Sequence, residues 1–375
     1  MAIARVVAWA VVAWCAAAAP AHAHGIQGRA DLPIPIRAFY WASAIVLVVS
    51  FVGLAAGWRR PLLAGWLERS ARSWRVGRVG RVLLVVARVC SVALLALVLA
   101  TALFGSTDLN ANFAPIWVFV VWWIGIALLA ATVGDWWRAV HPVAVLARLL
   151  GLPEGSTGRL PRAAGMWIAF VGLLAFTWLE LVYPTAANVR LLGLLVFGWT
   201  AGTLLAMRSF GIGDTLDRVE PFAAYTRVLG HLGVVGRGAP GGDDGLRVRP
   251  PVLGLLGLRE QPGLAAFTGL LIGSVSYDGL SRTLWWKQRV ASSTVRLVEQ
   301  GLSASQAQQL LGTLGLVMMV SVGIGAFLAF GQLARIVGRL PRRTARFGSV
   351  AGAFAPSLVP IAFAYVVAHY VSFFW

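Results

Sequence analysis

Eight long apolar segments alternate with shorter polar segments along the chain. They cover residues 39–58, 83–104, 116–136, 163–183, 191–207, 263–280, 310–334 and 350–374. A helix of about 20 apolar residues crosses the hydrocarbon layer of a bilayer, which is roughly 30 Å thick. The pattern therefore predicts an all-α fold, a polytopic integral membrane bundle of about eight transmembrane helices.

The composition supports a membrane protein. Of the 375 residues, 59% are hydrophobic and 12% are charged, whereas a soluble domain has about 25% charged residues. The formal net charge of +18 comes from basic residues placed between apolar segments, and no aromatic residues alternate with them as in a nucleic-acid groove. Nucleic acid is therefore not a predicted partner.

The N-terminus has the pattern of a secretory signal peptide at residues 1–23. Arg5 is followed by an apolar stretch and by the small-x-small sequence Ala21-His22-Ala23, which is typical of a cleavage site. Cleavage would leave His24 at the new N-terminus. An uncleaved anchor is the alternative and predicts the same orientation for residues 24–375, which form a single predicted transmembrane domain.

The polar segments differ in arginine content in a way that predicts orientation. Those after the first, third, fifth and seventh apolar segments carry four to seven arginines each. The segment after the second carries none, the one after the fourth carries Arg190, and the one after the sixth carries Arg282, Lys287, Arg289 and Arg296. Lys and Arg resist translocation, so the arginine-rich segments are predicted to be cytoplasmic. Both ends of the mature chain would then be extracytoplasmic, in a bacterial plasma membrane.

The first cytoplasmic segment is expected to contact lipid. Its arginines recur at every third residue, and in a helix they would form a basic stripe suited to anionic headgroups. These arginines are Arg69, Arg72, Arg75, Arg78 and Arg81.

A larger cytoplasmic loop is predicted at residues 208–262. Within it, residues 221–235 could form a short amphipathic or re-entrant helix. The chain shows no convincing internal repeat, so the repeated halves of many transporters are not predicted. Gly269 and Gly273 are four residues apart in an apolar segment, a spacing that allows two helices to approach closely.

Four ionisable residues within apolar segments are the candidate functional groups, because such residues usually face the bundle interior or a cavity. Glu180, Asp278 and His369 come from different predicted helices and lie near the predicted outer surface. Asp135 lies at the inner surface, where Arg138 is close enough for a local pair. His141, just before Pro142, is interpreted as structural.

The outer group allows several interpretations. Two carboxylates and one or two imidazoles, His24 included, could bind a divalent metal and activate water, or could pass protons. Alternatively, each group reaches interfacial water, and Asp278 pairs with Arg282 four residues later.

Four stretches of the sequence are distinctive in combination: "AHGIQGRADLPIPIRAFYWASAIVLVVSFV", "GDTLDRVEPFAAYTRVLG", "SYDGLSRTLWW" and "LVPIAFAYVVAHYVSFF". Together they resemble a family of bacterial, largely actinobacterial, polytopic membrane proteins labelled fenitrothion hydrolase. The resemblance implies hydrolysis of an apolar organophosphate ester. Pro356 stands where members of that family often have a histidine, which would remove one metal ligand.

Three functions follow from these observations. The first is metal-assisted hydrolysis of a small-molecule ester, with Asp278, Glu180 and His369 as catalytic residues and with His24 added to them as a metal ligand. The second is a transporter or permease for an ion, a metal or a small solute. The third is a membrane scaffold without catalysis.

Overall fold

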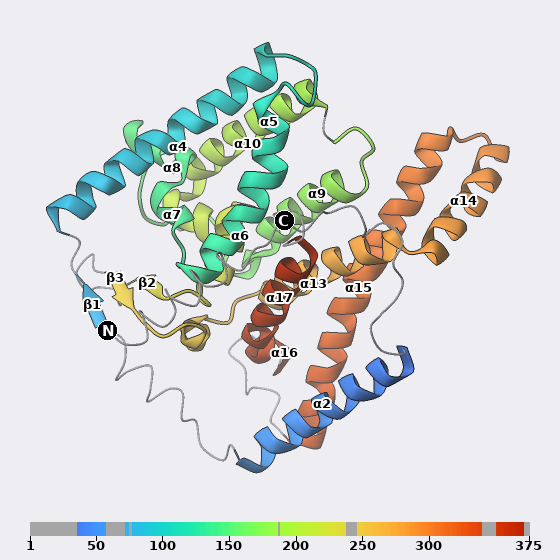
Figure 1. Ribbon diagram of the computed structural model, residues 1–375. Coiled ribbons are helices and arrows are strands. Elements are labelled where there is room, and N and C mark those ends of the chain that lie inside the picture. Colours follow the sequence, from blue (N-terminus) through green and yellow to red (C-terminus); the bar gives the residue numbers. More distant parts are fainter. Residues whose placement is uncertain are drawn as a thin grey trace, which may run out of the picture. The chain divides into compact units, whose positions relative to one another are not determined.

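The computed structural model describes residues 36–57, 72–74, 77–186, 188–237, 246–339 and 350–370 (Figure 1). The chain forms two compact units. One contains residues 1–62 and 370–375, and the other contains residues 63–369. In the first unit, helix α2 (Ile36–Gly57) occupies the first predicted apolar segment. The predicted signal peptide and His24 lie outside the described residues.

The described chain is helical almost throughout, which confirms the all-α class. Among the described residues, six helical segments are long and apolar enough to cross a membrane: Arg78–Phe104, Phe113–Thr132, Arg162–Leu181, Val189–Phe210, Ala304–Val337 and Val350–Ala368. The predicted number of eight is not confirmed. The predicted segment 263–280 forms the 19-residue helix α13 (Leu264–Arg282), which is not among the six.

The second unit begins with two apolar helices and two short ones. These are α4 (Arg78–Phe104), a second helix built from α5 (Phe113–Ile116), η1 (Trp117–Trp122) and α6 (Trp123–Thr132), and the short α7 (Trp137–Val140) and α8 (Pro142–Leu149). A similar series follows it. It contains η2 (Arg162–Ala164), α9 (Trp167–Leu181), α10 (Val189–Phe210), α11 (Ile212–Asp214), η3 (Thr215–Val219) and α12 (Pro221–Gly230).

The two series end in similar sequences, so the prediction that the chain lacks an internal repeat is wrong. Residues 134–151 read GDWWRAVHPVAVLARLLG, and residues 213–230 read GDTLDRVEPFAAYTRVLG. Eight of these 18 aligned positions are identical. Equivalent residues are 79 positions apart. In two cases, Arg138 with Asp217 and His141 with Glu220, a residue of the first repeat contacts its equivalent in the second.

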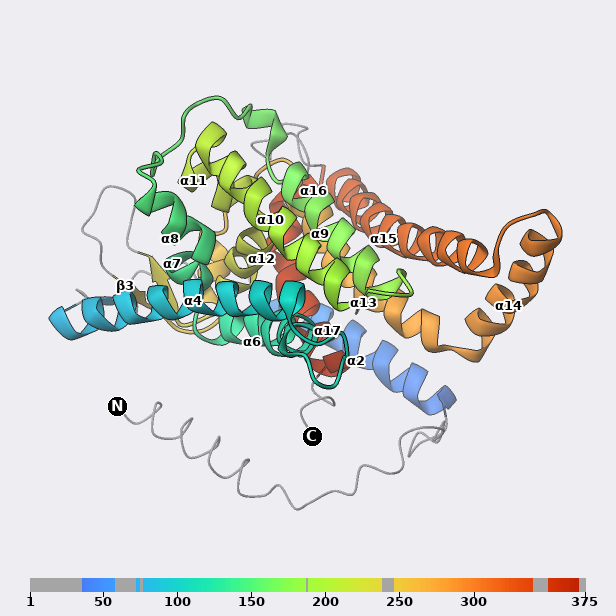
Figure 2. The same ribbon diagram turned by 90° about the horizontal axis from the view of Figure 1, so that it is seen from above.

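The contacts between helices follow the same repeat (Figures 1 and 2). Helix α8 packs against α4 of its own repeat and α10 of the other, and α12 packs against α9 of its own repeat and α6 of the other. Each short helix is thus held between one helix of each repeat. We call this reciprocal packing the exchange between the repeats. An approximate two-fold relation between the repeats requires it.

Backbone hydrogen bonds repeat the exchange. After α12, the N–H groups of Val234 and Val235 donate to the carbonyls of Thr132 and Val133, at 3.2 and 2.7 Å. After α8, the carbonyls of Pro153 and Glu154 accept from Ile212 and Gly213, both at 2.9 Å. The segment that follows each short helix therefore bonds to the end of the long helix of the other repeat.

The predicted loop at 208–262 is more ordered and more buried than expected. The expected short helix is present as α12, and most of its side chains are buried against α6 and α9. Further on, β2 (Val235–Arg237) and β3 (Leu246–Val248) form an antiparallel sheet with β1 (Arg72–Trp74), in the order β1-β3-β2. The predicted helical stripe of arginines is therefore interrupted, because Arg72 lies in a strand and α4 begins only at Arg78.

The remaining helices form a second group in the same unit. They are η4 (Leu253–Gly257), α13, α14 (Leu284–Glu299), α15 (Ala304–Val337), α16 (Val350–Phe354), η5 (Ala355–Ser357) and α17 (Leu358–Tyr370). Helices α13 and α15 pack closely, as the glycine spacing predicts. A Cβ atom on Gly273 would lie 2.7 Å from the Cα of Val320, and one on Gly269 would lie 2.7 Å from the side chain of Ile324.

Candidate functional site

The short helices α8 and α12 begin in the same way. His141 precedes Pro142, and Glu220 precedes Pro221. A residue before proline is held in extended conformation, and proline suits the first position of a helix because it has no N–H to leave unpaired. The side chains of His141 and Glu220 both accept hydrogen bonds from the first turn and so cap their helices.

The two capping side chains meet. His141 Nε2 lies 3.4 Å from Glu220 Oε2, and neither side chain is exposed to solvent. The N–H of Ala144 donates to His141 Nδ1 at 3.3 Å, which makes Nδ1 an acceptor and places the ring proton on Nε2. The imidazole thus holds α8 with one nitrogen and donates to Glu220 with the other.

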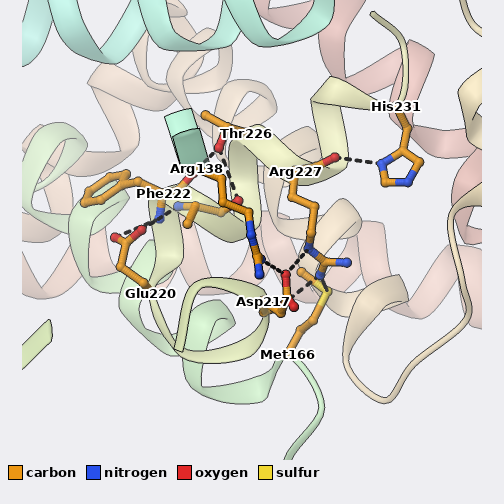
Figure 3. Close-up of polar contacts among 9 residues, drawn as sticks. Arg138, Met166, Asp217, Glu220, Phe222, Thr226, Arg227 and His231 are labelled. Carbon is orange, nitrogen blue, oxygen red and sulfur yellow. Dashed lines mark hydrogen bonds and ion pairs between the residues drawn. The ribbon is translucent and has the colours of Figure 1, made fainter. Parts of the chain in front are cut away.

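Glu220 is held by N–H donors from three directions. Its Oε1 accepts from Trp199 Nε1 at 3.0 Å and from the backbone N–H of Phe222 at 3.1 Å. Its Oε2 accepts from the backbone N–H of Ala223, beside the bond that Phe222 makes to Oε1 (Figure 3). The same Oε2 faces His141 Nε2. Every partner in this set is a donor, which suits an acceptor-only carboxylate.

The pair lies at the level of the middle of the surrounding helices. Trp199 is near the centre of α10, and Trp122 is near the centre of the segment from Phe113 to Thr132. The ring of Phe222, two residues after Glu220, lies 4.5 Å from that of Trp122 and 5.1 Å from that of Phe176 in α9. Ionisable groups at such a depth are costly and are usually functional.

A cavity of about 960 Å³ adjoins the pair. The helical path is interrupted at His141, between α7 and α8, and at Glu220, between η3 and α12, and we call these two segments the broken helices. The wall of the cavity is built from α4, η1, α9 and α10 and from the broken helices, and it includes Glu220, Pro221 and Pro142. Most lining residues are apolar, and six are tryptophans: Trp117, Trp122, Trp136, Trp137, Trp178 and Trp199. A mostly apolar cavity with few polar groups is the usual form of a small-molecule site.

A second polar contact joins the repeats beyond the cavity (Figure 3). The guanidinium of Arg138 donates to the carboxylate of Asp217. Arg227 approaches the same carboxylate, with Nε 3.9 Å from Oδ1, and donates to the Asp217 carbonyl at 2.9 Å. Arg138 and Asp217 occupy equivalent positions in the two repeats, so this ion pair, like the His141–Glu220 contact, lies across their interface.

His231 follows α12 and donates from Nδ1 to the carbonyl of Arg227 at 2.7 Å. Burial is the main reason that the pKa of His231 is lowered from 6.5 to about 4. The hydrogen bond to the Arg227 carbonyl opposes this shift, and the charges of Arg227 and Arg249 add to it. The folded protein therefore holds this imidazole neutral at pH values where the unfolded chain protonates it.

His231 should make the protein sensitive to mild acid. Above its unfolded pKa of 6.5 its contribution to stability is fully present, and it is lost as the pH falls toward the folded value of about 4. Between pH 7 and pH 5, unfolding should become easier by about 2 kcal/mol. Thermal unfolding at several pH values measures this loss. His231→Asn keeps a donor and should flatten the slope, whereas an unchanged slope would assign the acid sensitivity to other groups.

The predicted outer group is described only in part. Asp278 is buried and pairs with Arg282, with Oδ1 3.2 Å from Nε, so the local (i, i+4) pair expected as an alternative is confirmed. Glu180 lies in α9, close enough to Tyr225 for its charge to act on the phenol. His24 and the side chain of His369 lie outside the described residues.

No metal-binding group is formed by the side chains that the structure describes: among them, no three His, Cys, Asp or Glu residues are arranged to hold one ion. Because two of the four predicted ligands lie outside this part of the chain, the predicted divalent metal site at Glu180, Asp278, His369 and His24 stays a prediction.

Sequence reasoning missed the residues of the broken helices. From the sequence, Glu220 falls in the predicted cytoplasmic loop without a role. His141 is interpreted as structural, which agrees with its role as a helix cap but misses its contact with Glu220. The available signal was the alignment of His-Pro with Glu-Pro at a fixed offset, together with the shared Gly-Asp and Leu-Gly that flank them.

No known protein family, curated protein or solved structure matches the chain.

Proposed function

We propose that this chain is a membrane transporter, a permease for a small solute, whose binding site lies between the two repeats. One observation carries the proposal. Two broken helices from equivalent parts of the repeats meet through His141 and Glu220, in the middle of the apolar helices and beside a cavity. Interrupted helices, repeats and a site near the bilayer midplane are typical of secondary transporters.

The contacts across the repeat interface support movement between the repeats. His141–Glu220 and Arg138–Asp217 each join a residue of one repeat to the equivalent residue of the other. If one repeat rocks against the other, both contacts must part or rearrange together. These few polar contacts therefore stabilise one arrangement of the two repeats, and their loss accompanies the change to the other arrangement.

The orientation is part of the proposal. The arginine-rich segments lie in the cytoplasm next to anionic headgroups, and the mature termini lie outside a bacterial plasma membrane. In this orientation α6 and α10 both run inward, so the repeats are parallel and their two-fold axis lies along the membrane normal. Transporters with parallel repeats of this kind carry their sites between the two halves.

Metal-assisted hydrolysis of an apolar ester at Glu180, Asp278 and His369, which the family resemblance implies, is less well supported. Asp278 already has a cationic partner in Arg282. The acidic group that adjoins the cavity is Glu220, not one of the three predicted catalytic residues.

Alternating access can be tested with the native thiol of Cys90, which is exposed and lines the cavity. In a Cys15→Ser background, a membrane-impermeant maleimide should label Cys90 in both right-side-out and inside-out vesicles, because the cavity opens to each side in turn. Labelling from one side only would contradict transport and favour a scaffold or a one-sided enzyme.

A control cysteine fixes the sidedness of the vesicles. Ser292 is exposed on α14, which the proposed orientation puts outside. In the Cys15→Ser, Cys90→Ser background, Ser292→Cys should react only in right-side-out vesicles. Reaction from the inside alone would reverse the proposed orientation without deciding whether the protein transports.

A further inference from the structure

The wall of the cavity carries polar groups that the protein leaves unpaired. The indole Nε1 atoms of Trp136 and Trp137 and the hydroxyl of Thr215 are buried and have no hydrogen-bond partner among the described residues. All three residues line the cavity. Trp137 is 6% exposed and Thr215 is 0% exposed. A buried donor without a partner costs about 1 to 3 kcal/mol, so a ligand that supplies an acceptor would gain from these groups.

Two of these groups are related by the repeat. Trp136 and Thr215 are 79 positions apart, the spacing that separates His141 from Glu220. Each repeat thus places one unpaired donor on the cavity wall at the same position, five residues before the residue at which its helix breaks. The recurrence at equivalent positions indicates a built feature of the cavity wall and not a local packing accident.

The described lining of the cavity presents little uncompensated charge to a ligand. The Glu220 carboxylate already faces N–H donors at both oxygens, and it sits at the N-termini of α8 and α12, each of which carries roughly half a positive charge. A cationic ligand would therefore find the carboxylate largely compensated. An anionic ligand would face that carboxylate, and neither Lys nor Arg is among the described lining residues.

We infer that the cavity binds a neutral, lipophilic molecule that carries a hydrogen-bond acceptor oxygen, such as a ketone or an ester. Trp137 and Thr215, the two unpaired donors whose side chains are most buried, recognise this oxygen. The inference rests on the proposed function and names the chemical class of its solute. The apolar wall accepts the hydrocarbon part, and a neutral molecule of this kind reaches the cavity from the lipid layer. The tryptophan N–H donates to the oxygen, and the threonine hydroxyl can do the same.

A matched series of probes, each with a chain nine atoms long, tests the inference. Nonane, 5-nonanone, dibutylammonium and 2-butylhexanoate differ mainly in the central group, which is a methylene, a carbonyl, a cation or a carboxylate. The readout is protection of Cys90 from maleimide in the Cys15→Ser chain in nanodiscs, measured as the mole fraction of each probe in the lipid is raised. The ketone should reach half-protection at a mole fraction roughly fivefold or more below that of nonane, as one added hydrogen bond predicts.

Substitutions identify the groups that recognise the oxygen. Thr215→Val keeps the shape of the side chain and removes its hydroxyl, and Trp137→Phe removes the indole N–H but keeps a smaller aromatic ring. Each should bring half-protection by the ketone to within about twofold of that by nonane. Trp117→Phe is the matched control for the loss of ring volume, because Trp117 also lines the cavity but its indole nitrogen is not one of the buried, unpaired atoms. It should keep the preference for the ketone.

The outcomes separate this inference from the proposed function. Equal protection by the ketone and nonane in the wild-type chain overturns the inference without any variant, so a variant that fails to fold does not decide the matter. Preferential protection by dibutylammonium or by 2-butylhexanoate overturns it in favour of a charged ligand. Labelling of Cys90 from both sides of the membrane can hold in each of these cases. A ketone preference with labelling from one side only supports the binding site and rejects transport.

Discussion

Replacing Glu220 with alanine is expected to lower the free energy of unfolding by roughly 3 to 5 kcal/mol. The change removes the cap of α12, which is worth about 1 kcal/mol. It also leaves the N–H groups of Trp199 and His141 buried without their acceptor, and each such loss costs about 1 to 3 kcal/mol. Thermal and chemical unfolding of the purified protein in detergent measures the loss.

Glu220→Gln is the matched control for that result. Glutamine keeps the shape and one carbonyl oxygen, so it can still cap α12 or accept from Trp199, but its amide nitrogen meets a second N–H donor where Oε2 stood. The loss should fall to about 1 to 2 kcal/mol. Equal stability of the alanine variant and the wild-type chain would mean that the His141–Glu220 contact does not hold the broken helices together.

The sequence predicts those parts of the fold that depend on local pattern. Runs of apolar residues near 20 in length locate most of the long helices, and the glycines at 269 and 273 correctly indicate a close helix contact. The short helix from Pro221 is also readable, since Glu220 caps it and Pro221 starts it. These features need only neighbouring residues, which the linear sequence contains.

The broken helices and their meeting point depend on contacts between distant residues. His141 and Glu220 are different residue types, so their equivalence is hidden until His-Pro and Glu-Pro are aligned at the spacing of 79 positions. The similarity is confined to short segments within much longer apolar helices, which resemble each other in any membrane protein. Burial of the pair follows from packing on four long helices and cannot be read from hydropathy.

Asp278 shows that a charge in an apolar segment can have a local partner. A carboxylate in an apolar segment indicates function because burying a charge is costly. In the structure Arg282 stands one turn further along the same helix, with Nη2 3.3 Å from the second carboxylate oxygen. A local partner of this kind accounts for the charge without a site. Glu220 has no arginine or lysine within four residues after it, and its partners come from other helices.

Gly134→Ala is expected to destabilise the fold by roughly 3 kcal/mol or more. Gly134 has a φ of +136°, which side chains other than glycine rarely adopt. A Cβ atom there would lie 2.0 Å from the carbonyl oxygen of Val235, so the backbone would have to move. That backbone carries the hydrogen bond from Val235 to Val133, and the substitution therefore breaks one of the two exchanged contacts between the repeats.

Two other glycines make the test specific. Gly213 is the equivalent of Gly134 in the second repeat, but its φ is not positive and an added Cβ would lie 3.1 Å from the Glu154 oxygen. Gly213→Ala should cost about 1 kcal/mol. Gly198 lies inside α10 with nothing within 4 Å of an added Cβ, so Gly198→Ala should leave the midpoint unchanged or raise it. We expect the lowest unfolding midpoint for Gly134→Ala, an intermediate one for Gly213→Ala and the highest for Gly198→Ala. A wild-type midpoint for Gly134→Ala would mean that the segment after α12 does not hold the end of α6.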